Sequence, residues 1–329
     1  MKNVLEWLEA TVEKCPDKPA FSDTESSITF AQVYDIARNA GAYLIEKLGV
    51  DRTPVAVFAG RKMVTPAYFL GVVYAGRPYA PIDASLPDKR IEKILENLCP
   101  GAIVADRESR EHVESIVDEL AKAEGFDRPQ IFIAEDISRF EQVACADSNC
   151  KISESAGDAV TDSENDTDGG VVAGCAGKTD DSSRDMLAVV RRQMSMTDPL
   201  YIIYTSGSTG NPKGVMTSHL SLMTYINAYC DVMHIEESDV LGNQSPLDYI
   251  AAIRDIYLPL KTGCSTAIIP KEYFMEPNAL FDYMNDKKVS SVGWSVSAFT
   301  ILTSLGAFEE VGLKSLRKIC FSGSVMPCR

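Results

Sequence analysis

Short apolar runs that alternate with amphipathic segments constrain the fold of this 329-residue chain more than any other feature. Residues 54–58, 102–105 and 131–134 are continuous apolar runs of strand length, as expected for strands buried on both faces of a parallel sheet. Helical spacing of apolar residues predicts helices at 4–12, 30–48, 66–74 and 112–124. This alternation predicts an α/β fold of doubly wound sheets with flanking helices.

Residues 144–185 interrupt the alternation. The segment has no aromatic residue and no leucine, and its ten acidic residues outnumber three basic ones. Such a composition buries too little apolar surface to offset the entropy of ordering. The sequence therefore predicts a disordered acidic insertion between a first α/β subdomain (1–143) and a second one (186–329). An acidic docking segment is the alternative, whereas a calcium loop is disfavoured because the EF-hand spacing is missing.

Composition excludes several classes of function. A formal net charge of −15 argues against a general nucleic-acid binder. The three histidines are scattered and the nine cysteines show no CxxC spacing, so no metal site is predicted and free thiols in a reducing cytoplasm are expected. The chain has no signal-peptide pattern and no run of about 18 apolar residues. A cytoplasmic protein without a membrane partner is predicted.

The segment 204–214, Tyr-Thr-Ser-Gly-Ser-Thr-Gly-Asn-Pro-Lys-Gly, carries the clearest chemical signal. It follows a predicted strand, and its glycines let backbone N–H groups approach an anion closely. Its lysine adds a compact charge suited to phosphate oxygens. The segment therefore predicts a polyphosphate-binding loop. Walker A spacing fails because Gly214 follows Lys213, and the G-x-G-x-x-G pattern fails at Thr209, so a P-loop NTPase is disfavoured.

This segment resembles the phosphate-loop signature of the adenylate-forming (AMP-binding) superfamily, which includes acyl-CoA synthetases, luciferases and adenylation domains of nonribosomal peptide synthetases. Residues 28–33 resemble the family's early signature. Residues 70–83 resemble a second signature, which is typical of amino-acid adenylation domains and D-alanine–carrier-protein ligases. The resemblance covers the chain except the acidic insertion. It implies the N-terminal domain of the adenylate-forming fold in truncated form.

The resemblance implies an ATP-dependent carboxylate-activating ligase. A small carboxylic or amino acid would attack the α-phosphate of ATP, with Mg²⁺ as the expected metal cofactor, and pyrophosphate would leave. A phosphopantetheine thiol of a carrier protein, or CoA, would then capture the acyl-adenylate. The residues that the resemblance assigns to nucleotide phosphates are Thr205, Ser206, Gly207, Ser208, Thr209, Gly210, Lys213 and Gly214.

The predicted substrate pocket departs from the pattern of family members that activate α-amino acids. Those members carry Phe-Asp-x-Ser, whose aspartate holds the substrate ammonium. An ungapped register through residues 244–259 puts Ile250 at that position and Ala251 after it. An apolar residue cannot pair a buried ammonium. Either the substrate lacks a normally placed α-amine, which we favour, or Asp248 takes over the pairing.

The same register makes Arg254 a pocket residue. There it could bind a second carboxylate of the substrate; the alternative is an arginine on an exposed helix face. A looser alignment adds Gly293 and Ser322 to the pocket.

The chain ends at Arg329, before several segments that the family carries. The resemblance puts the adenylation lysine in a C-terminal lid domain, which is expected to be absent, so no catalytic residue is assigned here. An N-terminal fragment that is weak or inactive alone is predicted. The alternative is a non-catalytic nucleotide- or partner-binding remnant.

Overall fold

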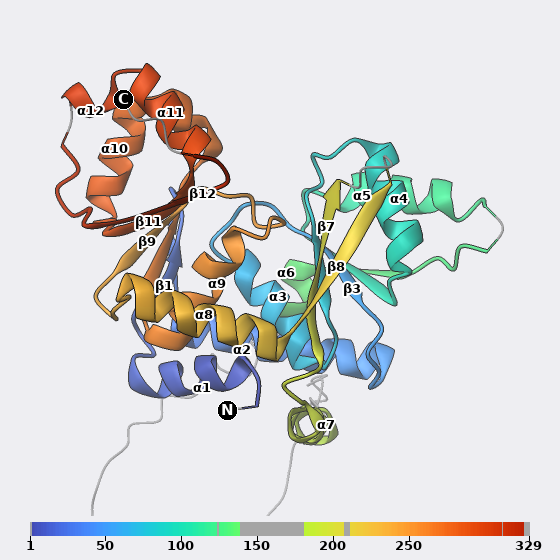
Figure 1. Ribbon diagram of the computed structural model, residues 1–329. Helices are drawn as coiled ribbons and strands as arrows, with labels where there is room; N and C mark the ends of the chain where they lie inside the picture. The colour runs from blue at the N-terminus through green and yellow to red at the C-terminus, as the bar shows by residue number, and fades with distance from the viewer. Residues whose placement is uncertain (1, 124, 139–180, 207–210, 311, 326–329) are drawn as a thin grey trace, which may run out of the picture.

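Two six-stranded sheets with helices packed between them form the centre of the molecule (Figure 1). The computed structural model describes residues 2–123, 125–138, 181–206, 211–310 and 312–325. The main hydrophobic core joins buried residues of both sheets, such as Phe21 and Val55, to the helices between them. The predicted α/β class with flanking helices is confirmed.

The first sheet has the strand order β12-β11-β9-β10-β1-β2. Among the described residues its neighbouring strands pair in parallel, except β1 with β2. Its strands are β1 (Pro19–Ser22), β2 (Ser27–Thr29), β9 (Val240–Asn243), β10 (Ser265–Ile268), β11 (Ser291–Ser295) and β12 (Lys318–Ser322).

The second sheet has the order β6-β5-β3-β4-β7-β8. Its pairs are parallel within the part of the chain that the structure describes, except the antiparallel hairpin β7–β8. Its strands are β3 (Val55–Phe58), β4 (Tyr79–Ile82), β5 (Ala102–Ala105), β6 (Gln130–Ile133), β7 (Pro199–Ser206) and β8 (Pro212–Ser218).

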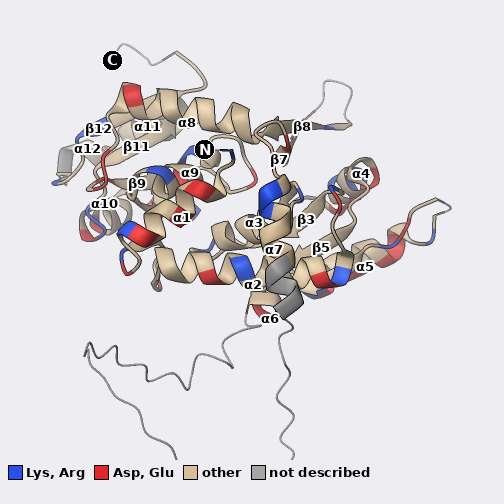
Figure 2. Ribbon diagram, turned by 90° about the horizontal axis from the view of Figure 1, so that it is seen from below, with Lys and Arg blue, Asp and Glu red and all other residues tan. Residues whose placement is uncertain are grey.

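Helices cover both faces of each sheet. The outer face of the second sheet carries α4 (Asp88–Leu98) and α5 (Arg110–Leu120). The outer face of the first sheet, on the opposite side of the molecule in Figure 2, carries η1 (Lys271–Met275), α10 (Pro277–Asp286), α11 (Val296–Ser304) and α12 (Ala307–Glu310). The remaining helices are α1 (Leu5–Lys14), α2 (Phe30–Leu48), α3 (Thr65–Tyr74), α6 (Ala134–Ser138), α7 (Asp181–Gln193), α8 (His219–Met233) and α9 (Ala252–Thr262).

The predicted division into subdomains 1–143 and 186–329 does not follow the sheets. Strands β1 and β2 join the first sheet beside β10, whereas β7 and β8 join the second sheet beside β4. Strand pairing depends on neighbours far along the chain, so an interruption in the sequence does not mark a boundary in space. Helix α7 begins at Asp181, inside the range predicted as a disordered insertion. Residues 144–180 of that range lie outside the described residues.

Helices α2 and α3 make the closest helix contact at the centre of the molecule. Helix α2 begins with a capping box in which Thr29 accepts a hydrogen bond from the backbone N–H of Gln32. Further along, Gly41 of α2 and Gly71 of α3 face the partner helix without a side chain. A Cβ on Gly41 would lie 2.6 Å from Cβ of Tyr74, and a Cβ on Gly71 would lie 2.7 Å from Cβ of Ala40. Neither distance accommodates two carbon atoms.

We expect Gly71→Ala to destabilise the protein by about 1–3 kcal/mol, because the added methyl overpacks this contact. The loss should appear although alanine favours a helix over glycine by about 1 kcal/mol. Urea denaturation measures the change, with Gly312→Ala as the control, since nothing lies within 4 Å of a Cβ there. A Gly71→Ala variant as stable as the parent would contradict the close contact.

A buried histidine joins the N-terminus to the start of α8. His219 is 1% exposed, and its Nδ1 accepts a hydrogen bond from the backbone N–H of Val4 at 3.4 Å. Burial lowers the pKa of His219 to about 4, against a smaller opposing effect of Asp198. The folded protein therefore keeps this imidazole neutral where an unfolded chain would protonate it.

The free energy of unfolding should fall as the pH drops from about 6.5 to about 4, because only the unfolded state gains a proton on His219 in this window. The full effect is on the order of 3 kcal/mol. Denaturant titrations at several pH values measure it as the difference between the parent and His219→Asn. Replacement of the exposed His112 by Asn is the control. Identical pH slopes in the parent and His219→Asn would contradict this assignment.

Candidate functional site

The predicted phosphate loop joins β7 to β8 at the edge of the second sheet (Figure 1). Across this hairpin Thr205 is paired with Lys213, and Ser206 with Pro212. Thr205, Ser206, Lys213 and Gly214 are exposed, so their side chains and backbone can reach a ligand. The four remaining residues of the prediction, 207–210, lie outside the described residues.

Gly214 has a packing role beside the predicted access to phosphates. It is paired with Tyr204 across the hairpin. A Cβ on Gly214 would lie 2.9 Å from Cγ2 of Ile202 and 3.1 Å from Cζ of Tyr204. The Tyr204 ring therefore lies over the glycine, and a larger residue there would displace it.

Arg254 lies at the start of α9 and is 6% exposed. Its Nε donates to Oδ1 of Asp255 at 2.8 Å, and its Nη2 donates to the carbonyl oxygen of Gly293 at 2.5 Å. The guanidinium also lies 5.3 Å from the ring centroid of Tyr229. The alternative of an exposed helix face is therefore wrong, because the side chain points inward against β11.

Gly293 permits this arrangement, since a Cβ at that position would overlap the Arg254 guanidinium. Burial opposes the charge on Arg254, but the ion pair with Asp255 outweighs it and raises the pKa of the guanidinium. The structure thus brings together two of the predicted pocket residues, Arg254 and Gly293.

The partners of Arg254 form a buried polar network that sequence reasoning missed. Asp255, 3% exposed, accepts a hydrogen bond from Nδ2 of Asn243 at 3.0 Å. Arg61, after β3, donates from Nη2 to the backbone and side-chain oxygens of Asn243 at 3.0 Å. Burial lowers the pKa of Arg61, although Asp255 opposes this. The adjacent Arg254-Asp255 pair was the available signal, because neighbouring opposite charges inside an apolar helix suggest a buried pair.

The other predicted pocket residues are less enclosed. Ile250 is 47% exposed, and Ala251, just before α9, is half-buried. Ser322 is exposed at the end of β12, where it is paired with Ser295 of β11. Ser322 therefore lies at the carboxyl end of a parallel strand, the usual place for ligands in α/β sheets, whereas Gly293 lies in the middle of β11.

Asp248 faces a different space. It lines a cavity of about 700 Å³ at the carboxyl ends of β3, β4, β9 and β10, together with Asp83 and Arg61. Burial and the charge of Asp83 raise the pKa of Asp248. The other five predicted pocket residues do not line this cavity within the described structure.

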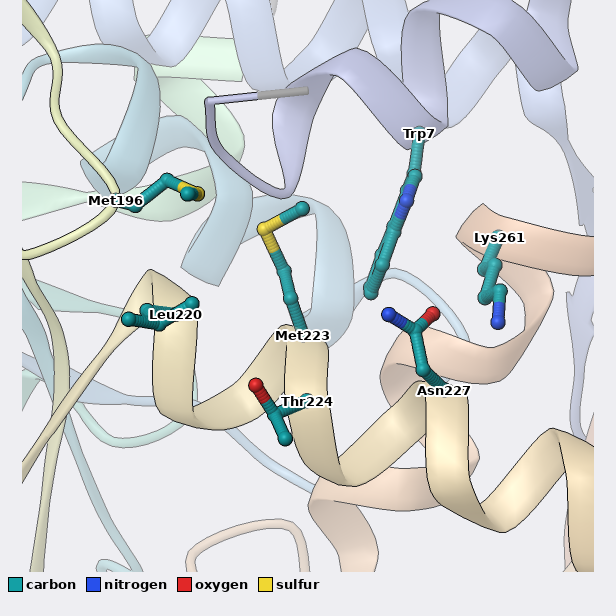
Figure 3. Close-up of a pocket in the computed structure, with 7 residues that line it drawn as sticks. All are labelled: Trp7, Met196, Leu220, Met223, Thr224, Asn227 and Lys261. Carbon is teal, nitrogen blue, oxygen red and sulfur yellow. The ribbon is translucent and has the colours of Figure 1, made fainter.

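A second cavity, of about 480 Å³, is formed by α1, α8, the end of α9 and the segment before β7 (Figure 3). None of the predicted site residues that the structure describes lines it. Its lining residues are Trp7, Met196, Leu220, Met223, Thr224, Asn227 and Lys261. Lys261 is its one ionisable residue, so it offers no pair of groups for acid–base chemistry.

Over the described ranges, no three or more His, Cys, Asp or Glu side chains are grouped to hold a metal ion. No helix in the described part of the chain has the length and apolar character needed to cross a bilayer.

A model of the AMP-binding enzyme family matches residues 8–328, so the chain belongs to that family. Similar proteins include the D-alanine–D-alanyl carrier protein ligases of Bacillus velezensis, 26% identical over 327 residues, and Bacillus cereus, 25% identical over 325 residues. Both matches cover 98% of this chain and 54% of the relative. The chain therefore spans about half the length of the curated relatives that it matches.

Solved structures share the fold. VinN in complex with L-aspartate matches 100% of this chain and 72% of its own, with a TM-score of 0.73 and 16% identity. The nonribosomal peptide synthetase FmoA3 matches 99% of this chain and 29% of its own, with a TM-score of 0.72 and 20% identity. The resemblance to adenylate-forming enzymes inferred from the motifs is confirmed.

We expect Arg254→Leu to lower the free energy of unfolding by about 3–5 kcal/mol, because it leaves the buried Asp255 carboxylate without its cation. Adding Asp255→Leu should recover part of the loss. The control is Arg52→Leu, which breaks the ion pair between Arg52 and Asp198. The Arg52 side chain is 58% exposed, so this substitution should lower the free energy of unfolding by less than about 1 kcal/mol. Equal effects in denaturant titrations would show that the Arg254 pair is not buried as described.

Proposed function

We propose that this chain contains the nucleotide- and acid-binding part of an ATP-dependent carboxylate-activating ligase. The observation that carries the proposal is the β7–β8 hairpin, where Thr205, Ser206 and Lys213 are exposed together at one edge of the second sheet in a chain of the AMP-binding enzyme family. In this proposal all eight residues of the predicted loop contact the nucleotide phosphates. The competing function is that of a non-catalytic remnant of such an enzyme, which binds a nucleotide or a partner.

The proposed reaction is acyl-adenylate formation. A carboxylate oxygen of the substrate attacks the α-phosphate of ATP, the bond to the β-phosphate breaks, and pyrophosphate leaves. Lys213 and the hydroxyls of Thr205 and Ser206 stabilise the charge that develops on the phosphates. Mg²⁺ accompanies the ATP in this proposal, because it is commonly bound through substrate phosphates with one or two carboxylates.

The proposed substrate is a small acid without a normally placed α-amine. Ile250 supports this, because it offers no charge to an ammonium group. Asp248 also supports it, because it lines the cavity of about 700 Å³ in which neither Arg254 nor Gly293 is among the described lining residues. Arg254 is already paired with Asp255 and Gly293, so in this proposal it limits the depth of the pocket and supplies no free charge.

The proposed acceptor is a phosphopantetheine thiol on a carrier protein, or CoA. The names of the curated relatives, which are ligases for D-alanine and a D-alanyl carrier protein, support a carrier protein. A cytoplasmic location goes with this proposal, because a thiol acceptor stays reduced there.

We expect Lys213→Met to weaken ATP binding by the chain about tenfold or more, because it removes the cation from the hairpin. Isothermal titration with ATP and with inorganic tripolyphosphate measures the change. Lys271→Met, an exposed lysine beside the 700 Å³ cavity, is the charge-matched control. Equal loss in both variants would mean that the hairpin does not bind the phosphates.

The substrate is tested with the full-length protein that the gene encodes. Pyrophosphate exchange with a panel of small acids should favour those that lack an α-amine. A preference for an ordinary α-amino acid would reject the proposed pocket, unless Asp248→Ala abolished that preference. ATP binding without exchange for any acid of the panel would support the non-catalytic remnant.

A further inference from the structure

Helix α4 contacts the hairpin that carries the predicted phosphate loop. The hydroxyl of Tyr204, in β7, donates a hydrogen bond to Oδ1 of Asn97 at 2.8 Å. Lys93 Nζ donates to Oδ1 of Asn211, just before β8, at 3.2 Å. Lys93 and Asn97 are four residues apart and therefore share one face of α4. Figures 1 and 2 both show α4 beside the end of the hairpin where β7 is followed by β8.

The hairpin needs such support because the sheet supplies little. Among the described residues, the register of β7 with β4 consists of one pair, Tyr79 with Tyr201. Beyond this point β7 pairs with β8 alone, and β8 is the edge strand. An isolated two-stranded hairpin is marginally stable in water. Contacts with α4 therefore decide where the end of the hairpin lies.

Tyr204 is suited to this anchoring role. Its ring packs against the outer core between the second sheet and α4. Burial raises the pKa of Tyr204 to about 12, so its hydroxyl remains a donor to Asn97 even at alkaline pH values near the ordinary tyrosine pKa of about 10. The ring also lies over Gly214, which couples the two strands of the hairpin to the helix.

Anchoring Tyr204 also fixes the direction of the Thr205 and Lys213 side chains. Side chains alternate along a strand, and paired residues across a hairpin share a face. Tyr204 and Gly214 occupy the face towards α4, so the next pair, Thr205 and Lys213, occupies the opposite face. A slip of one residue would exchange the two faces.

We propose that Asn97 and Lys93 are positioning residues for phosphate binding, which act through Tyr204 and Asn211 to aim Lys213 at the ligand. The inference rests on the proposed function of the hairpin. In this proposal neither residue contacts the phosphates, because Asn97 is bonded to Tyr204 and Lys93 to Asn211.

A double-mutant cycle in the purified chain tests the Asn97 contact, with inorganic tripolyphosphate and ATP as probes in isothermal titration. Asn97→Ala and Tyr204→Phe should each weaken binding about two- to tenfold. The double variant should bind as tightly as the single variant with the lower affinity, because both substitutions remove the same hydrogen bond. In a Lys213→Met background, Asn97→Ala should have no further effect. Additive losses in either experiment would overturn the positioning role.

Lys93 is tested against a lysine on the same helix. Lys93→Met should weaken binding about two- to fivefold, and Lys93→Arg should restore it. Lys89→Met removes the same charge from α4, but Lys89 contacts Glu92 of that helix at 3.0 Å, so it should leave the affinity unchanged. Equal affinities of Lys93→Met and Lys89→Met would overturn the role of Lys93. Denaturation midpoints should stay constant across these variants.

The result for Lys213→Met separates the two levels of the proposal. If Lys213→Met weakens binding while the α4 variants do not, the hairpin binds phosphate and only the positioning role fails. If the parent chain binds neither probe, the proposed function fails and the positioning role fails with it.

Discussion

The close approach of α2 and α3 is the contact on which the remaining layers depend. Gly41 and Gly71 let the two helices pack without intervening side chains, and buried residues on both helices join the core that reaches both sheets. Since interiors are packed as densely as organic crystals, a wider spacing here would move one sheet relative to the other. The carboxyl ends of β9 and β3, which carry Asn243 and lead into Arg61, would then no longer meet.

The residues of the predicted site fall into two groups, which are held in place by different kinds of interaction. Arg254 and Gly293, which were predicted for the substrate pocket, are held by buried charge and close packing, in which each group has a fixed partner. The hairpin is exposed and is held mainly by one hydrogen-bonded face of α4. The buried group is therefore fixed on all sides, whereas the position of the hairpin depends on a few contacts at its surface.

Local patterns predicted individual elements better than their neighbours. The apolar runs at β3, β5 and β6 and the helical spacing of α2 are properties of contiguous residues, so they could be read directly. The place of β1 beside β10 could not, because pairing depends on a strand more than 200 residues away. The register around Ile250 made Arg254 a predicted pocket residue, and a looser alignment added Gly293, but neither indicated whether the charge of Arg254 was free. Asp255 decides that question, and the spacing of residues does not reveal the direction of a side chain. Asn97 was missed because a lone asparagine on an amphipathic helix carries no motif.

The pairing of Phe21 with Thr266 in β1 and β10 has a consequence for biosynthesis. A ribosome adds roughly 5–20 residues each second, so β1 waits on the order of ten seconds or more before its partner strand exists. During that time the second sheet can assemble β3 to β6, whereas the first sheet has only the short β1–β2 pair. The nascent chain therefore leaves the edge of β1 that pairs with β10 uncovered late into translation, and unpaired strand edges of this kind favour pairing with other chains.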